Sequence, residues 1–467
     1  MGGGELQLIA PASTAEAAQM EFIVGQPQMS FFKFVYRRHT NFSMQSTRES
    51  FFNTPVLDQS SRGRFTCTFS GRRADALKEI YLCYTLPPVY SDETFKFTWV
   101  RRIANYIIYR TSITLDNGRS IDDQYGEWMD VWNELTLSEN KKGLYDRMTG
   151  NDPLWTQPTD PKPRVFIKNN RLTYSYPVGA AGKPSIPGRR FIVPLPFWFT
   201  KNPALVLPLC ALQLQTLNIT VETRALDELY QLYDIYSGEY MGRRAWNESH
   251  PSRAGVDTSI GRFLSPDGTT GGQTQIALDA YLECQYIFLD RDERTAMTFA
   301  HHQMLVEQVF RFEKGGIKNN EIINLTLNNP VKEFIWFFRR ADAAERNDWT
   351  TFTEKSGSGI LSTAKLVWNK NYERLEDKPA EFFEYMQTFQ HHSGSPRPGI
   401  YTYSFALYPE KWQPSGAYNT AIITANQLAI TVNPPPSEDV EYECVVYALC
   451  YNVFEAMAGI GGLKFTP

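Results

Sequence analysis

The stretch from residue 188 to 223 constrains the fold most, because its first half breaks regular structure and its second half predicts a strand. Four prolines lie among large apolar residues in the first half: Pro194, Pro196, Pro203 and Pro208. Proline fixes φ and removes a backbone donor, so this half cannot be an interior helix or a central strand. In the second half Leu217, Ile219 and Val221 alternate with polar residues, which is typical of a half-buried strand.

A similar strand pattern returns near the end of the chain. The sequence LNITV at 217–221 is matched by LAITV at 428–432, which begins 211 residues later. We predict two copies of one β-domain, each closed by a similar strand, and a corner at the prolines where the chain leaves the first copy. Chance similarity between short apolar strings is the alternative.

Length and composition agree with a folded protein of several domains. A chain of 467 residues is too long for one ordinary core, so two or three domains are expected. Aromatic residues make up 14% of the chain, and 28 prolines and 30 glycines favour many short strands and turns. The net charge of −4 argues against a protein that coats nucleic acid.

The cysteines and the chain ends give no sign of export or of a membrane anchor. Six cysteines stand singly and predict reduced, buried thiols rather than a metal site. The first residues have no basic region, so we expect no secretory signal, and Leu6 does not fit the myristoylation pattern. No apolar span is long enough to cross a bilayer.

Two short stretches change from the period of a strand to that of a helix. Behind Asp122 and Asp123, large apolar residues recur at helical spacing, and we expect this stripe to be core rather than a ligand platform: Tyr125, Trp128, Met129, Trp132 and Leu135. A second short helix is predicted at 379–390, with Pro379 in its first turn.

Residue patterns for catalysis or metal binding are missing, so the sequence predicts no catalytic residue, no cofactor, no metal and no enzyme. The histidine pairs 301–302 and 391–392 would point to opposite faces of a strand and chelate poorly. The cluster of Asp290, Asp292 and Glu293 has arginines between its acids, which favours a self-neutralised turn over a divalent-ion or acid/base site.

Four N-x-S/T triplets could in principle carry glycans. They begin at Asn41, Asn218, Asn247 and Asn324, and two of them fall in strand-like runs. Asn247 lies in a polar connection and is the candidate acceptor, although without a signal segment we expect no glycan from the secretory route.

Several strings identify a family resemblance. They are GGGELQL at 2–8, GQPQMSFFKFVYRRHTNF at 25–42, PLPFWFTKNPALVLPLCALQ at 194–213, YLECQYIFLDRDERTAMTFA at 281–300, YTYSFALYPEKWQPSGAYNT at 401–420 and GGL at 461–463. Together they resemble the major capsid proteins of nucleocytoplasmic large DNA viruses.

The resemblance implies an all-β fold, a double jelly roll of two eight-stranded antiparallel β-sandwiches in tandem with short inserted helices and long loops. The expected parts are an N-terminal segment at 1–24, a first jelly roll at 25–225, an interdomain connection at 226–275 and a second jelly roll at 276–467. Loops at 140–187, 226–275 and 340–375 are the expected outer towers.

The resemblance also implies a structural function. The chain would form homotrimeric pseudo-hexagonal capsomers that tile an icosahedral shell over an internal membrane, in a virion assembled in the host cytoplasm. Its partners would be itself, neighbouring capsomers, minor capsid proteins on the inner face and proteins of the internal membrane, without direct contact to nucleic acid.

Rival functions stay open at this point. A carbohydrate-binding β-sandwich protein would need an exposed aromatic platform, for which Trp246 and Trp349 are the candidates. A less abundant capsid paralogue would share every feature of the principal capsomer. An enzyme on the same fold would need clustered histidines and carboxylates, which the sequence does not show.

Overall fold

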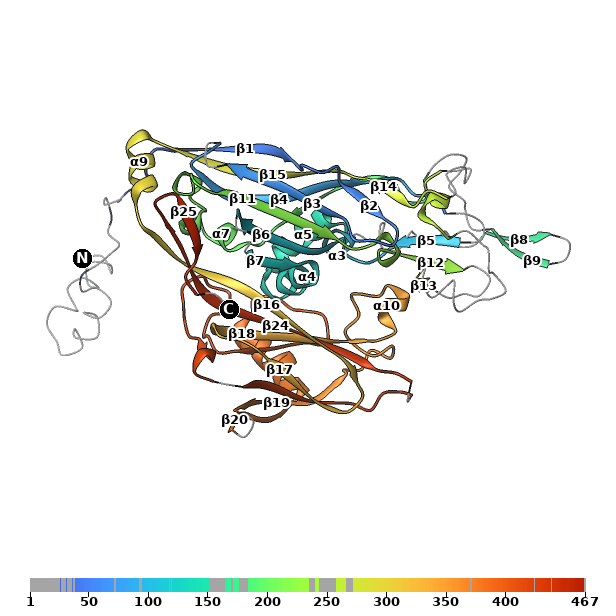
Figure 1. Cartoon of the computed structure of the whole chain (residues 1–467). Coiled ribbons are helices and arrows are strands. Elements are labelled where there is room, and N and C mark those ends of the chain that lie inside the picture. Colours follow the sequence, from blue (N-terminus) through green and yellow to red (C-terminus); the bar gives the residue numbers. More distant parts are fainter. Residues whose placement is uncertain are drawn as a thin grey trace, which may run out of the picture. The chain divides into compact units, whose positions relative to one another are not determined.

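The structure is a computed structural model of the whole chain (Figure 1). It describes residues 26, 31, 36 and 38–465, without 71–72, 92–94, 117, 119, 152–163, 169–170, 176–183, 235–239, 243–257, 266–271, 370–371, 424 and 438. The chain divides into two compact units, 1–42 and 43–467, and the features below belong to the second. The expected N-terminal segment 1–24 lies outside the described residues.

The first sandwich consists of two four-stranded antiparallel sheets. One sheet has the order β1-β15-β4-β10 and the other the order β3-β11-β6-β7. The strands are β1 (Phe42–Ser50), β3 (Arg64–Ser70), β4 (Ala76–Leu86), β6 (Ile108–Leu115), β7 (Ser120–Tyr125), β10 (Arg189–Pro194), β11 (Thr216–Thr223) and β15 (Asp279–Leu289).

The second sandwich repeats this arrangement. Its sheets have the orders β16-β24-β18-β21 and β17-β23-β19-β20. The strands are β16 (His302–Ile317), β17 (Asn320–Leu325), β18 (Pro330–Arg340), β19 (Leu361–Trp368), β20 (Tyr372–Pro379), β21 (Ile400–Ser404), β23 (Asn426–Val432) and β24 (Tyr442–Met457). Taken in chain order, each strand of the second sandwich occupies the sheet position of its counterpart in the first, so the predicted double jelly roll is confirmed.

The repeated strand predicted from the sequence is also confirmed, with one correction. Residues 217–221 lie in β11 and residues 428–432 in β23, and both strands stand second in their sheets. They are, however, the seventh strand of each sandwich and not the last. The eighth strands are β15 and β24, because the chain must return to the opposite sheet before the sandwich is complete.

Strand β15 corrects the predicted domain boundary. The predicted second jelly roll includes residues 276–289, but β15 pairs with β4, with Leu282 opposite Leu82, and with β1 in the first sandwich. The predicted boundary followed from the family resemblance, and the apolar pattern of this strand fits either sheet. Part of the predicted connection 226–275 packs on the first sandwich: β12 (Tyr230–Asp234) pairs with β5 (Phe95–Trp99) in a separate three-stranded sheet, and Tyr230 and Leu232 lie in the first core cluster.

The proline-rich stretch is a corner inside the first sandwich rather than at its end. Pro194 ends β10, and the chain then turns through α7 (Trp198–Lys201), η3 (Pro203–Leu205) and η4 (Leu209–Ala211) before β11 begins. The prolines therefore lie where the chain passes from one sheet to the other. As expected, they stand outside the strand interiors.

Both predicted helices are present. The first is α4 (Gly126–Thr136), after β7, and the second comprises η8 (Phe382–Met386) and α11 (Gln387–His391), after β20. The remaining elements are β2 (Val56–Asp58), α3 (Ile103–Tyr106), α5 (Glu139–Thr149), β8 (Arg164–Lys168), β9 (Arg171–Ser175), η5 (Leu226–Glu228), β13 (Tyr240–Gly242), η7 (Ile260–Phe263), β14 (Gln275–Ala277), α9 (Arg291–Phe299), α10 (Ala343–Arg346), β22 (Tyr418–Asn419), η9 (Thr420–Ile422) and β25 (Ile460–Leu463). Among the described residues, the helices are all too short or too polar to span a membrane.

Three apolar clusters stabilise the fold. Each sandwich has its own core, and a third cluster lies between α4 and the outer face of the sheet that contains β18 and β24. Strand β18 is consequently buried on both faces, with Trp336 in the core of its own sandwich and Ile335 and Phe337 in the third cluster. This double burial explains why EFIWFFRR reads as a continuous apolar run rather than an alternating one.

All six cysteines are free and buried, as predicted. Burial raises the pKa of the Cys67 thiol to about 12 and that of the Cys83 thiol to about 11. Because the thiolate is the reactive form, both groups are inert at neutral pH.

The equivalence of β11 and β23 predicts equal costs for matched truncations. Ile219 and Ile430 lie 211 residues apart, and each is fully buried in the core of its own sandwich. We expect Ile219→Ala and Ile430→Ala each to lower the free energy of unfolding by about 2–5 kcal/mol, measured by urea denaturation. Ile322→Ala, at an exposed position on β17, should cost less than about 0.5 kcal/mol. A loss at only one of the two buried positions would contradict the equivalence.

Candidate functional site

Helix α4 joins the two sandwiches, and the first residue of the helix fixes where it starts. A Cβ atom on Gly126 would lie 2.1 Å from the carbonyl oxygen of Asn105 and 2.2 Å from that of Ile108. Any side chain at this position would collide with backbone, so only glycine allows the helix this close to the first sandwich. Met129 then points into the core of that sandwich.

The opposite face of α4 is an apolar stripe that packs against the second sandwich. Trp128, Val131, Trp132 and Leu135 share the third cluster with the outward-facing side chains of the sheet, which are Val309, Ile335, Phe337, Ile400, Val445, Tyr447 and Leu449. The rings of Trp128 and Tyr447 lie 5.2 Å apart. The predicted aromatic stripe is therefore core, but it is the core of a joint between two sandwiches rather than of one sandwich.

Glu127 at the start of α4 is held by arginines from both sandwiches. Arg224, which follows β11, bonds to one carboxylate oxygen, and Arg339 of β18 donates to the same oxygen at 2.8 Å. Arg311 of β16 lies 3.9 Å from the other oxygen. Burial alone would raise the pKa of Glu127, but Arg339 and Arg224 outweigh it and hold the pKa at about 2.

Asp130 and Glu134 repeat this arrangement one turn further along α4. Arg102, beside α3, binds Asp130 at 2.6 Å and Glu134 at 2.5 Å. Arg397, before β21, binds Asp130 at 2.5 Å and lies 3.7 Å from Glu134. Burial opposes ionisation of Asp130, but the two guanidinium groups lower its pKa below the usual value. Each of the three carboxylates thus contacts arginines from both sandwiches.

Backbone contacts close the C-terminal end of the joint. The amide of Gly394 donates to the carbonyl oxygen of Leu135 at 2.7 Å, and Ser393 donates its hydroxyl to the carbonyl oxygen of Thr136 at 3.0 Å. A Cβ atom on Gly394 would lie 2.2 Å from the carbonyl oxygen of Glu134, so this position also requires glycine.

A buried histidine anchors the segment that makes these contacts. His392 Nε2 lies 2.7 Å from a carboxylate oxygen of Glu333 on β18, and Nδ1 lies 3.3 Å from Glu410. Burial lowers the pKa of an imidazole, but here the two carboxylates outweigh it and raise the pKa to about 9. His392 is thus a charged structural residue, with both ring nitrogens facing carboxylates.

A loop of the second sandwich makes a further contact with the first sandwich. Asn347, in the left-handed region at φ 54°, donates from its amide to the carbonyl oxygens of Asp227 at 2.6 Å and Tyr230 at 2.8 Å. The indole of Trp349 donates to the carbonyl oxygen of Glu228 at 2.7 Å. The predicted tower loop 340–375 therefore contributes at least these residues to the joint, and Trp349 is not an exposed sugar platform.

The other sequence candidates have structural roles or fall outside the described residues. Asp290 caps α9 through the amide of Arg291, and Arg294 pairs with Asp75 at 2.6 Å, so the acidic cluster is a helix start. The described residues contain no group of three metal-ligating side chains. Asn247 and Trp246 lie outside the described residues.

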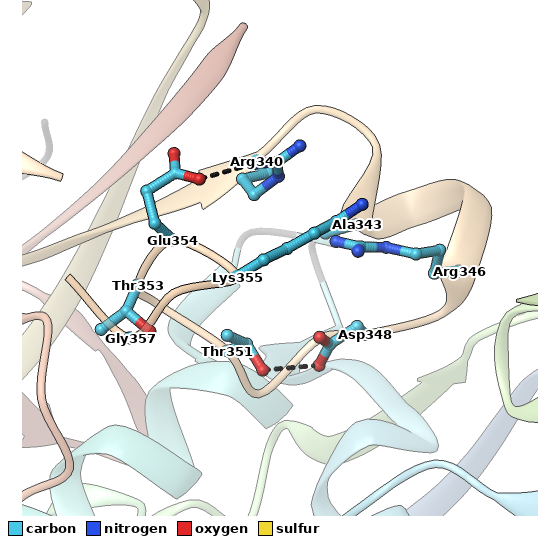
Figure 2. Close-up of a pocket in the computed structure, with 9 residues that line it drawn as sticks. All are labelled: Arg340, Ala343, Arg346, Asp348, Thr351, Thr353, Glu354, Lys355 and Gly357. Atoms are coloured by element: carbon cyan, nitrogen blue, oxygen red, sulfur yellow. Dashed lines mark hydrogen bonds and ion pairs between the residues drawn. The ribbon is translucent and has the colours of Figure 1, made fainter. Parts of the chain in front are cut away.

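One polar pocket of about 340 Å³ lies beside the joint (Figure 2). Arg340 pairs with Glu354 at 2.5 Å and with Asp342 at 2.9 Å, and Arg346 pairs with Asp342 at 3.3 Å. Lys355 also lines the pocket, as Figure 2 shows, and its amine lies 3.6 Å from Asp342. Because the pocket's cations lie against nearby acids, it offers little net charge to an ionic ligand.

The functional residues that sequence reasoning missed are the acids of α4 and their arginine partners. On the sequence Glu127, Asp130 and Glu134 look like the solvated face of an amphipathic helix. One signal could have indicated otherwise: a strand at 333–340 that is apolar on both faces needs a second partner, and the two-tryptophan stripe of α4 is a suitable one. What the arrangement can do is hold two sandwiches in one fixed relation.

Comparison with known proteins identifies the same protein class along the whole chain. The family model for the N-terminus of major capsid proteins matches residues 30–290, and the model for large eukaryotic DNA virus major capsid proteins matches residues 293–462. The change from one model to the other falls after β15, in the first turn of α9, in agreement with the sheet pairing of β15.

Individual relatives cover the chain from end to end. The major capsid protein of Pyramimonas orientalis virus is 30% identical, and that of Phaeocystis pouchetii virus is 29% identical, with each alignment covering 100% of both chains. A chain of the quasi-atomic structure of the PBCV-1 virus capsid is 22% identical, with a TM-score of 0.67 over 94% of this chain and 100% of that one. This last likeness shows the fold alone.

Removing one acid of the joint should cost far more than its size suggests. We expect Glu127→Gln to lower the free energy of unfolding by about 3–5 kcal/mol, because Arg224 and Arg339 stay buried without their counter-charge. Urea denaturation measures the loss. Glu139→Gln, at an exposed position on the neighbouring helix α5, should change it by less than about 0.5 kcal/mol. Equal effects of the two variants would show that the joint does not depend on this charge.

Glu127 and His392 predict that the stability of the fold decreases at both low and high pH. Glu127 has a depressed pKa, so its contribution of about 3 kcal/mol is present above pH 4.5 and is lost as the pH falls toward 2. His392 has a raised pKa, so its contribution is complete below pH 6.5 and is lost as the pH rises through 9. Thermal unfolding between pH 2 and 10 measures both. His392→Gln should remove the decrease in stability between pH 6.5 and 9 and leave the decrease at low pH unchanged. The same decrease between pH 6.5 and 9 in this variant would contradict the role given to His392.

Proposed function

Because the chain belongs to the major capsid protein family of large eukaryotic DNA viruses, we propose that three copies associate into a pseudo-hexagonal capsomer. Members of this family are structural proteins of the virion shell and not enzymes, and this chain is accordingly a structural capsid protein. The proposal concerns how it assembles: homotrimers that tile an icosahedral shell.

The observation that carries the proposal is the strand-for-strand repetition of the sandwich. Two sandwiches with the same strand order make one chain a pseudo-dimer, and three such chains present six similar sandwiches around one axis. Six similar units can occupy a position with six neighbours in a lattice, whereas one sandwich repeated three times cannot. The charged joint supports this reading, since such a unit has to hold its two sandwiches in one relation.

The remaining parts of the proposal rest on the family resemblance. We infer that the shell encloses an internal membrane, that minor capsid proteins and proteins of that membrane contact its inner face, and that assembly takes place in the host cytoplasm. Asn247 stays the proposed glycan acceptor, and the connection 226–275 stays a proposed tower loop. A less abundant capsid paralogue is the second candidate, and the copy number per virion would separate it from the principal capsomer.

The mass in solution tests the trimer. We expect sedimentation analysis of the purified chain to give three times the mass of one chain, which is 53.6 kDa. At high concentration we expect hexagonal arrays in electron micrographs. A monomer that stays monomeric up to array-forming concentrations would refute the proposal, and glycan binding by that monomer would favour the carbohydrate-binding alternative instead.

A further inference from the structure

The second sandwich carries a helical segment at the same place in its fold as α4. Residues 380–391, which include η8 and α11, connect β20 to β21, as α4 lies in the connection from β7 to β10. Counted from the end of the preceding strand, Met129 of α4 corresponds to Phe383, and each points into the core of its own sandwich. The two helices are therefore equivalent in position and in orientation.

The outward faces of these helices differ in what covers them. On α4, Val131, Trp132 and Leu135 are buried against the second sandwich. Their counterparts by the same count are Tyr385, Met386 and Phe389, which are 61%, 53% and 91% exposed. These three side chains line a groove of about 680 Å³ together with residues 394–398. Nothing in the described part of the chain covers this stripe, although its residue types are those of interface anchors.

The two sheets that could bind such a helix also differ in whether a helix covers their outward face. In the second sandwich, the outward face of the sheet β16-β24-β18-β21 is covered by α4. In the first sandwich the equivalent sheet is β1-β15-β4-β10, whose outward side chains include Tyr81, Cys83, Ile192 and Tyr281. None of the three apolar clusters contains these side chains, and Ile192 is exposed. Cys83 and Tyr281 are buried on this face, with the guanidinium groups of Arg48 and Arg190 over the Tyr281 ring. Among the described residues, the chain thus has one uncovered helix and one sheet face whose apolar residues lie under its own arginines.

Charges on the two free surfaces resemble those of the joint. In the joint, Glu127 of the helix meets Arg311 of β16, which lies opposite Tyr447 in the sheet. On the free sheet, Arg48 of β1 lies 3.9 Å from the ring centre of Tyr281, and Arg190 bonds to the hydroxyl of the same tyrosine. On the free helix, Glu381 and Glu384 stand at the positions of Glu127 and Asp130. Asp279 and Glu283 also lie on the sheet, where they accept from Arg48 and Ser46.

We propose that the helical segment 380–391 of one copy binds the outward face of the sheet β1-β15-β4-β10 of the next copy, and that this contact repeats between chains the joint that α4 makes within one chain. The occupant of the groove is a second copy of this chain, because the chain itself carries the complementary surface. The contact is heterologous, because a helix of one copy meets a sheet of the next. Joints within a chain and contacts between chains then alternate, and three chains close a ring of six sandwiches. This inference rests on the proposed trimer and specifies its interface.

A matched pair of exposed phenylalanines tests the helix side. Phe389→Asp should convert the trimer to a monomer, with the dissociation constant raised about 30-fold or more, because it places a charge at the centre of the contact. Phe52→Asp, at a phenylalanine that is also 91% exposed but belongs neither to the helical segment nor to a strand of the sheet, should leave the trimer intact. Analytical ultracentrifugation measures both, and unchanged thermal unfolding of the monomeric variant shows that the fold survives.

A mixing experiment tests the sheet side and the direction of the contact. Ile192→Asp alters only the sheet surface, so this variant should also be monomeric by itself. Mixed with Phe389→Asp it should form a one-to-one dimer, because one intact helix and one intact sheet remain in the mixture. A contact of helix with helix would instead leave Ile192→Asp able to associate by itself.

The outcomes separate this inference from the proposed trimer. If the unaltered chain is a monomer, both fail. If the unaltered chain is a trimer and both aspartate variants stay trimeric, the trimer stands and this interface is wrong. A trimer that is broken by Phe389→Asp and not by Phe52→Asp, together with the mixed dimer, supports the inference.

Discussion

The buried carboxylates of α4 are the interaction on which the two-sandwich unit depends. The apolar stripe of the helix supplies most of the attraction between the sandwiches, but apolar contact tolerates sliding and rotation. Charges buried between guanidinium groups do not, because a carboxylate that loses its partner in a dry joint is strongly penalised. Glu127 and Asp130 each contact arginines from both sandwiches, so a shift of either one breaks a buried ion pair. Burial thus holds the sandwiches together, and the charges determine their register.

Much of the fold was predictable from local sequence pattern. The period of two in 217–221 and 428–432 indicated equivalent strands, and the helical spacing after Asp122 and at 379–390 indicated both inserted helices. The domain boundary was not predictable in this way. Strand β15 has the same apolar pattern as the strands of either sandwich, and only its pairing with β4, about 200 residues earlier in the chain, assigns it to the first.

The joint was beyond sequence reasoning for a related reason. Its ion pairs are long-range: Glu127 and Arg339 are 212 residues apart, and Asp130 and Arg397 are 267 apart. In the sequence these residues look like solvated charges on a helix and at strand ends. Nothing local distinguishes a carboxylate in water from one between two arginines, because the difference depends on which surfaces meet. The apolar run of β18 indicated that a second partner existed but not which segment it was.

The double burial of β18 and β24 has a consequence for biosynthesis. During translation the first sandwich emerges from the ribosome before the second, and α4 with its tryptophan stripe is already attached to it through Gly126. The sheet of the second sandwich, whose outer face is as apolar as its inner one, can then pack directly against the tryptophan stripe of α4. Made in the opposite order, the same sheet would stand in water with its outer face bare, as a template for aggregation. The order of the two sandwiches along the gene is therefore itself a safeguard during vectorial folding.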